Sequence, residues 1–177
     1  LIMVINVKDR YTYGHTERVV IYCQMIADEL ELSESDRKKL IYAAYLHDIG
    51  KIDTPKLVLN KEMSLTKEEW EILKQHPVKG AEIIRPVKSI NNIMPLIKHH
   101  HERYDGGGYP DGLKGEEIPY LARVLTVVDC FDAMTTNRPY KKKRNFDDAV
   151  EELKRCKNTQ FDPEIVEAFI RALSKNN

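Results

Sequence analysis

The sequence predicts an all-α fold on three observations. Apolar residues recur at helical spacing along most of the chain, capping residues and prolines mark where helices begin, and no stretch alternates like a half-buried strand. The length of 177 residues suffices for one well-buried domain and is short for two. We therefore expect residues 1–177 to form a single helical domain.

Two helices are predicted in the N-terminal part. The first has an apolar stripe formed by Val19, Cys23, Ile26 and Leu30. His15 lies four residues before Val19 and therefore falls on the same, buried face. Residues 33–36 resemble a capping box that begins the second helix. This helix carries His47 on its apolar face, and Gly50 is the expected stop.

Caps and prolines place further histidines at helix ends. Thr66 and Glu69 form another capping signature. Pro77 then breaks the helix, so that His76 falls at the break. Ser89 is expected to cap a helix that ends with two histidines, His100 and His101.

The C-terminal part begins with a glycine-rich loop. Residues 104–119 contain five glycines and two prolines and predict a structured loop. Pro119 opens the next helix, whose otherwise apolar inward face carries Asp129. Two final helices are expected to begin at Asn145 and at Asp162-Pro163.

Composition excludes several classes of protein. Basic and acidic residues both number 28, so no overall charge attracts a nucleic acid polymer or an acidic membrane. Three cysteines without a Cys-x-x-Cys pattern suggest neither a disulfide framework nor a thiolate zinc site, and a reducing cytoplasm fits best. No apolar run approaches the roughly 20 residues that span a bilayer. Because the chain starts at Leu1, we expect a C-terminal fragment of a longer multidomain regulator.

Seven imidazole and carboxylate side chains stand out as candidate metal ligands: His15, His47, Asp48, His76, His100, His101 and Asp129. Each histidine alone is most simply a hydrogen-bonded residue, but the joint pattern favours a metal. Since one ion takes four to six ligands, this set predicts a binuclear centre. Asp48 is the better candidate for a bridge, and a hydroxide between the metals would be the nucleophile. Imidazole and carboxylate without thiolate favour iron, manganese, zinc, nickel or cobalt over magnesium or calcium.

Several motifs in this order resemble the HD-GYP family, a branch of the HD phosphohydrolase superfamily. They include His47-Asp48-Ile49-Gly50-Lys51, His76-Pro77, the run from His100 to Pro110, residues 128–135, Arg138-Pro139-Tyr140 and Phe161-Asp162-Pro163. The resemblance implies an HD-domain helical bundle with a Gly-Tyr-Pro loop beside a central metal site. It also implies hydrolysis of the bacterial second messenger cyclic di-GMP to pGpG and, in some members, on to GMP.

The resemblance carries roles onto individual residues. The family's metal ligands match all seven candidates given above, and His47, Asp48 and Lys51 take the catalytic roles. Substrate contacts are implied for Lys51, Tyr109, Arg138 and Lys141. An arginine can fork onto a phosphate, and a lysine beside the metals can neutralise charge developing on phosphorus. His99 lies outside the family pattern, and we expect it at the surface.

The resemblance also sets expectations for cofactors and partners. Members with three metals have a glutamate four residues before the first histidine, where this sequence has Tyr11. We therefore expect two divalent metal ions, iron or manganese first, with zinc, nickel and cobalt as alternatives, and pGpG as the product. The family binds diguanylate cyclase domains, here through the Gly-Tyr-Pro loop. An upstream sensory domain that anchors the parent protein to a membrane is expected by analogy, and a homodimer stays open.

Two other functions compete with this one. Another cyclic dinucleotide such as cyclic GMP-AMP, or an unrelated phosphoester, would use the same metal site. Alternatively, the domain is a cyclic-dinucleotide sensor or a protein-interaction module. The complete ligand set favours catalysis over sensing alone.

Overall fold

The computed structural model describes residues 14–61, 63–136 and 144–175. These ranges contain helices joined by turns and loops and no strand, apart from one isolated bridge between Lys157 and Phe161. The predicted all-α class is therefore confirmed. Within the described ranges, no helix combines the length and apolar composition that crossing a bilayer requires.

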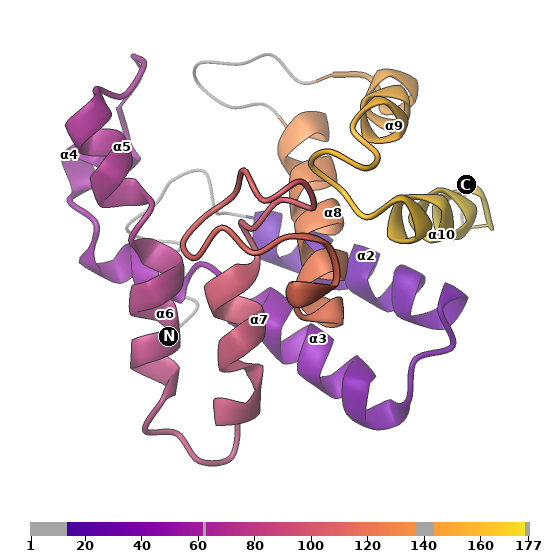
Figure 1. Ribbon diagram of the computed structural model, residues 1–177, viewed down its shortest axis with the longest axis horizontal. Helices are drawn as coiled ribbons and strands as arrows, with labels where there is room; N and C mark the ends of the chain where they lie inside the picture. The colour runs from indigo at the N-terminus through magenta and orange to yellow at the C-terminus, as the bar shows by residue number, and fades with distance from the viewer. Residues whose placement is uncertain (1–13, 62, 137–143, 176–177) are drawn as a thin grey trace.

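Helix α8 (Tyr120–Thr135) is the centre of the bundle, with most of its residues buried. It packs against α2 (His15–Glu29), α3 (Glu34–Leu46) and α7 (Met94–His99). Figure 1 shows α9 (Phe146–Arg155) and α10 (Pro163–Lys175) on the other side of α8 from α7. Aromatic rings join these layers, since Phe131 of α8 meets Phe169 of α10 edge to face at 5.2 Å.

A second layer surrounds α6 (His76–Ile84), which packs on α7 and on the 3-10 helix η1 (Ile49–Asp53). Gly50 makes this packing possible, because a Cβ there would lie 1.9 Å from the main-chain oxygen of His76. The short helices α4 (Lys56–Leu59) and α5 (Lys67–Leu73) lie at the edge of the bundle (Figure 1). None of the residues of α5 is buried.

Most predicted helix starts agree with the structure. Ser33 accepts from the Asp36 amide, Thr66 and Glu69 form a full capping box, and Asn145 caps α9. The predicted role of Ser89 was wrong, because a 3-10 turn, η2 (Asn91–Ile93), precedes α7. Helix α7 begins at Met94, and Pro95 lies in its first turn, which the fixed φ of proline suits.

The predicted stop at Gly50 also came too late. Helix α3 ends at Leu46 with His47 as its C-cap, and the backbone tightens into η1. His47 and Asp48 thus lie where the chain turns, between two helices. This turn directs adjacent side chains to the same region of the bundle.

Candidate metal centre

The seven predicted ligands converge on one region from five segments. All of them except Asp48 fall into two groups, and within each group the potential ligand atoms lie within 4.8 Å of one another. We call them the His76 group, which is His76, His100 and His101, and the His15 group, which is His15, His47 and Asp129. Helix ends deliver most of these side chains: α2 and α6 begin with a histidine, and α7 ends just before His100.

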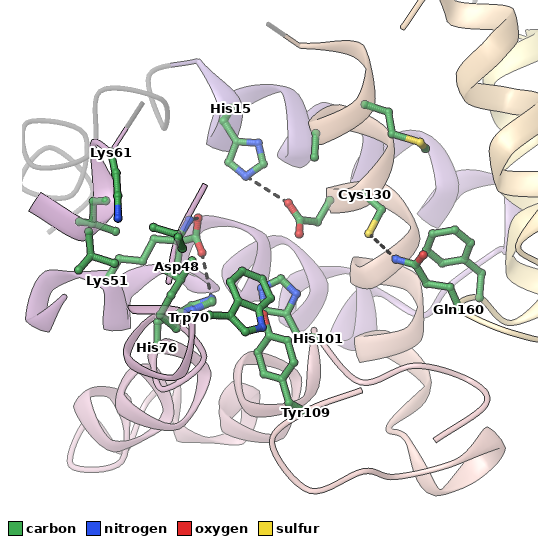
Figure 2. A pocket seen from close by; sticks show the side chains of 18 of the residues that line it. His15, Asp48, Lys51, Lys61, Trp70, His76, His101, Tyr109, Cys130 and Gln160 are labelled. Atoms are coloured by element: carbon green, nitrogen blue, oxygen red, sulfur yellow. Dashed lines mark hydrogen bonds and ion pairs between the residues drawn. The ribbon is translucent and has the colours of Figure 1, made fainter. Parts of the chain in front are cut away.

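Asp48 lies between the two groups. Its Oδ1 is 3.4 Å from His76 Nε2, and its Oδ2 is 3.5 Å from His47 Nε2. One carboxylate therefore presents one oxygen to each group, which is the arrangement that a bridging ligand needs. Figure 2 shows Asp48 beside His76, with His15 across from them.

The His76 group is built to receive a cation. His76 Nδ1 donates to the Leu73 carbonyl, and His100 Nδ1 donates to the Ile97 carbonyl, both at 2.7 Å. Burial lowers the pKa of His76 to about 3 and the pKa of His100 well below its usual value. Both rings are thus neutral, and their two Nε2 lone pairs face each other at 3.4 Å. Two lone pairs at that distance repel unless a cation lies between them, so these residues fit a metal.

The His15 group is held in a different way. His47 Nδ1 donates to the Ala44 carbonyl at 2.8 Å, but His15 Nδ1 meets the Asp132 carboxylate at 2.7 Å. Arg18 in turn binds Asp132, with Nε 2.6 Å from Oδ1. Burial would lower the pKa of His15, but Asp129 and Asp132 together raise it to about 9. A metal bound at this group would therefore have to displace a proton from His15.

The carboxylates of the centre stay charged. Burial would raise the pKa of Asp48, but Lys51 and neighbouring imidazoles hold it well below its usual range. The Lys51 Nζ lies 2.7 Å from Asp48 Oδ2. Burial would also raise the pKa of Asp129, but His15, its main partner, holds this pKa well below its usual range. Two buried carboxylates provide the negative charge that divalent ions require.

A cavity of about 490 Å³ opens over these residues, a size typical of small-molecule sites. His15, Asp48, His76, His101 and Asp129 all line it. Tyr109 stacks on His101 with ring centroids 5.0 Å apart, and Trp70 of α5 meets Tyr109 edge to face at 6.5 Å. Figure 2 shows Trp70 and Tyr109 side by side in front of His101, and Cys130 and Gln160 on the other side of the view.

The Gly-Tyr-Pro loop is fastened by a buried carboxylate. Glu102 accepts from the Asp111 amide at 2.7 Å and from the Leu113 amide at 3.1 Å. Gly108 fits because a Cβ there would lie 2.3 Å from the main-chain nitrogen of Arg103. Tyr109 is further anchored by its amide, which donates to the His101 carbonyl at 3.2 Å. The loop thus positions Tyr109 over the ligand His101.

The expectation that His99 lies at the surface was wrong. Its side chain is 12% exposed, and its Nδ1 is 3.6 Å from Glu102 Oε1. The position just before His100 at the end of α7 turns it under the loop, toward Glu102 and Asp111. His99 therefore belongs to the base of the Gly-Tyr-Pro loop.

Other predicted residues are only partly placed. Lys51 and Tyr109 line the cavity. Arg138, Lys141 and Tyr11 lie outside the described residues. Residues that the sequence reasoning did not single out for the site include Trp70 and Asp132. The helical spacing around Asp132 predicts only that this residue lies on a helix. No local motif indicates that it pairs with His15.

Comparison with known proteins gives a consistent picture. A family model described as HD domain matches residues 1–165. A cyclic di-GMP phosphodiesterase of Thermotoga maritima is 41% identical over 173 residues, which are 96% of this chain and 46% of that protein. The 3'3'-cGAMP-specific phosphodiesterase 3 of Vibrio cholerae is 36% identical over 171 residues, covering 97% of this chain and 37% of the relative. The chain thus spans less than half the length of these two relatives.

A solved structure agrees on the fold. The HDG"Y"P protein from Bdellovibrio bacteriovorus superposes with a TM-score of 0.74 at 21% identity, over 90% of this chain and 51% of that one. The predicted HD-domain bundle is therefore confirmed. The match of the HD domain model over most of the chain, with relatives at 41% and 36% identity, assigns the chain to the HD domain family.

Proposed function

We propose that this domain is a metal-dependent phosphodiesterase that hydrolyses cyclic di-GMP to pGpG. The observation that carries the proposal is the position of Asp48, with one oxygen toward each of two buried ligand groups at the floor of a cavity. The relative from Thermotoga maritima is named for the same activity, which supports the substrate.

Each group would hold one divalent ion, with Asp48 shared between them. When bound, such ions generate a nucleophile from water at neutral pH and neutralise charge on the phosphate. The donor set of imidazoles and carboxylates suits iron or manganese, and also zinc, nickel or cobalt. Loading the protein with each metal in turn tests which of them supports turnover.

The chain's own residues then orient and stabilise the reacting phosphate. His47 and Asp48 would hold the metals, and the Lys51 ammonium beside Asp48 would neutralise charge that develops on the phosphoryl oxygens. Tyr109 forms the wall that orients the substrate over His101. Arg138 and Lys141 are proposed as further phosphate contacts, and Tyr11 in place of a glutamate supports a centre of two metals and arrest at pGpG rather than GMP.

A second candidate substrate is 3′3′-cyclic GMP-AMP. The relative from Vibrio cholerae named for it matches nearly the whole chain at 36% identity. Its ring of two phosphodiesters is the same as that of cyclic di-GMP, so the two ligand groups would serve for both substrates. A role only as a sensor or interaction module is the weaker alternative, because all seven ligand positions are occupied by metal-binding residue types.

We also propose the setting in which the domain works. It acts in the cytoplasm of a bacterium, joined in its parent protein to a sensory domain, with diguanylate cyclase domains as docking partners of the Gly-Tyr-Pro loop. A homodimer is the simplest assembly to test. The coverage of less than half of each relative supports the presence of further domains in the parent protein.

The test is chromatographic product analysis with anaerobically purified protein loaded with iron or manganese. Cyclic di-GMP and 3′3′-cyclic GMP-AMP are incubated beside chelated protein and the His47→Ala variant. We expect pGpG to form with metal and not in either control. Absence of hydrolysis in protein that holds two metal ions per chain would overturn the proposal, and GMP as the end product would overturn the expected arrest at pGpG.

A further inference from the structure

Two sets of residues that line the cavity beside the metal-binding residues differ in chemistry, and we call them its aromatic end and its polar end. The aromatic end is formed by Trp70 and Tyr109. The polar end is formed by Arg144, Glu152 and Gln160. Figure 2 shows Gln160 on the far side of the view from Lys61, with Asp48 and His101 between them. A cyclic dinucleotide carries its two bases on opposite sides of its phosphate ring, so each end would receive one base.

The polar end has a charged pair aligned by α9. Arg144 lies just before α9, and its Nη1 is 3.1 Å from Oε2 of Glu152. The two side chains are 35% and 19% exposed, and both line the cavity. Hydrogen bonds from Arg155 lower the pKa of Glu152 to about 2. Burial opposes this shift, and Arg144 adds to it. Arg155 forks onto this carboxylate, with Nη2 2.5 Å from Oε1 and Nε 2.9 Å from Oε2. The cavity therefore offers a guanidinium next to an ionised carboxylate that Arg155 holds in place.

Gln160 continues this end. Its Nε2 donates to Cys130 Sγ at 3.3 Å, and its main-chain amide donates to the Cys156 carbonyl. Cys156 Sγ in turn lies 3.8 Å from Glu152 Oε1. The amide and the charged pair thus belong to one connected wall at the junction of α8 and α9.

This combination complements guanine and not adenine. Guanine presents O6 and N7 as acceptors, which match a guanidinium, and presents N1–H and an amino group as donors, which match a carboxylate. Adenine has an amino group in place of O6 and an acceptor in place of N1–H. An adenine at the polar end would therefore place its amino group against the Arg144 guanidinium and its N1 acceptor against the Glu152 carboxylate, and such donor–donor and acceptor–acceptor contacts are how polar sites reject analogues.

We propose that the polar end is a guanine subsite, in which Arg144 and Glu152 read the base, while Trp70 and Tyr109 stack either purine at the aromatic end. Stacking on an aromatic ring tolerates any base, since every base has a π-face. This inference rests on the proposed phosphodiesterase function. It predicts that cyclic di-GMP and 3′3′-cyclic GMP-AMP are hydrolysed at comparable rates, because each can place a guanine at the polar end, whereas cyclic di-AMP cannot.

The competing view is that Arg144 and Glu152 form an ordinary ion pair near the surface. Such pairs contribute little to stability, so removing either side chain should leave the domain folded. Glu151 gives a matched control on the same helix. It pairs with Lys154 at 2.8 Å, and its side chain is 70% exposed. Glu151→Gln therefore makes the same change of charge on α9 outside the polar end.

The experiment measures kcat/KM for cyclic di-GMP, 3′3′-cyclic GMP-AMP and cyclic di-AMP with metal-loaded wild type, Glu152→Gln, Arg144→Gln and Glu151→Gln. The readout is the ratio of kcat/KM for cyclic di-GMP to that for cyclic di-AMP. Both substrates are assayed with the same preparation, so any loss of active protein cancels. We expect this ratio to fall about tenfold in Glu152→Gln and in Arg144→Gln and to stay constant in Glu151→Gln.

The failures can be told apart. A wild type that hydrolyses none of the three substrates overturns the proposed function, and the subsite with it. A wild type that hydrolyses them while both polar-end variants keep the wild-type ratio overturns the subsite and leaves the phosphodiesterase standing. An equal fall in Glu151→Gln would also overturn it, because the effect would then come from charge alone.

Discussion

The two ligand groups of the candidate metal centre are oriented by different kinds of partner. In the His76 group, the Nδ1 atoms of His76 and His100 donate to main-chain carbonyls three residues earlier in the chain. In the His15 group, His15 is oriented by the side chain of Asp132, which comes from another helix. Local carbonyls therefore orient His76 and His100 in the His76 group, whereas the His15 group combines such a carbonyl at His47 with a tertiary contact at His15.

This difference has a functional meaning. Carbonyls at a helix end are present in any sequence that forms the turn, so substitutions cannot remove them. A carboxylate that orients a histidine can be changed by one substitution, and such outer partners influence metal affinity strongly. The His15 group is thus the part of the centre whose affinity for metal is more easily altered.

The largest effect is expected from the residue between the groups. Asp48→Asn removes the charge that both groups share and should lower turnover of cyclic di-GMP by about a thousandfold or more, together with a loss of bound metal. Metal content by elemental analysis and the rate of pGpG formation measure both. Asp53→Asn, an exposed aspartate in η1, is the control. Normal metal content and turnover in Asp48→Asn would contradict the bridging role.

Asp132→Asn should separate the two groups. The amide cannot hold His15 as the carboxylate does, so metal affinity at the His15 group should fall about tenfold to a hundredfold. Affinity at the His76 group should not change, because its outer partners are carbonyls. Calorimetric titration of metal-free protein resolves the two binding steps. Equal weakening of both steps would show that the groups are not held independently.

The pH dependence of metal affinity should also distinguish the two ligand groups. His15, with its pKa raised to about 9, carries a proton below that pH, and a metal must displace it. His76 and His101, with pKa values lowered to about 3 and about 4 by burial, are already neutral. Between about pH 8 and about pH 7, metal affinity should therefore fall about tenfold at the His15 group and stay constant at the His76 group.

The same calorimetric titration, repeated in buffers with different enthalpies of ionisation, counts the protons released at each step. Because water bound by the metals can also lose a proton, the expected result is one more proton released at the His15 group than at the His76 group. Equal release at the two steps would contradict the contrast between them.

The smallest effect is expected from Thr126. Its hydroxyl oxygen lies 2.8 Å from the His100 carbonyl oxygen and 2.9 Å from the Ala122 carbonyl oxygen, so that its single proton is shared between the two acceptors. Thr126→Val keeps the volume and removes these bonds, so the free energy of unfolding should fall by about 1 kcal/mol. Metal stoichiometry should remain at the wild-type value. Loss of metal from the His76 group in this variant would mean that this group also depends on side-chain support.

Much of the fold follows from local signals in the sequence. The caps at Ser33, Thr66 and Asn145 and the proline at 119 each act within a few residues, and the structure uses them as predicted. The exception is Ser89, whose capping tendency lost to the proline in the first turn of α7. Where two local signals of similar strength compete, tertiary packing determines which one the helix uses, and this packing cannot be predicted from the local sequence.

The candidate site likewise contains residues that local signals predict and residues that they do not. Histidines and aspartates that end helices or interrupt apolar faces can be found by periodicity, and the structure brings all seven of these residues together. Asp132, Trp70 and the polar end could not be found this way, because their roles depend on contacts between distant segments. Asp132 is 117 residues from His15 in the chain, and only the packing of α8 against α2 makes them neighbours.

The most direct measurement follows turnover and metal content in one sample. Metal-free protein is titrated anaerobically with manganese or iron, and the rate of cyclic di-GMP hydrolysis is recorded at each equivalent bound. Two cooperating groups joined by Asp48 predict that turnover stays low after the first equivalent and rises with the second. Full turnover with one equivalent per chain, or none with two, would contradict the binuclear centre.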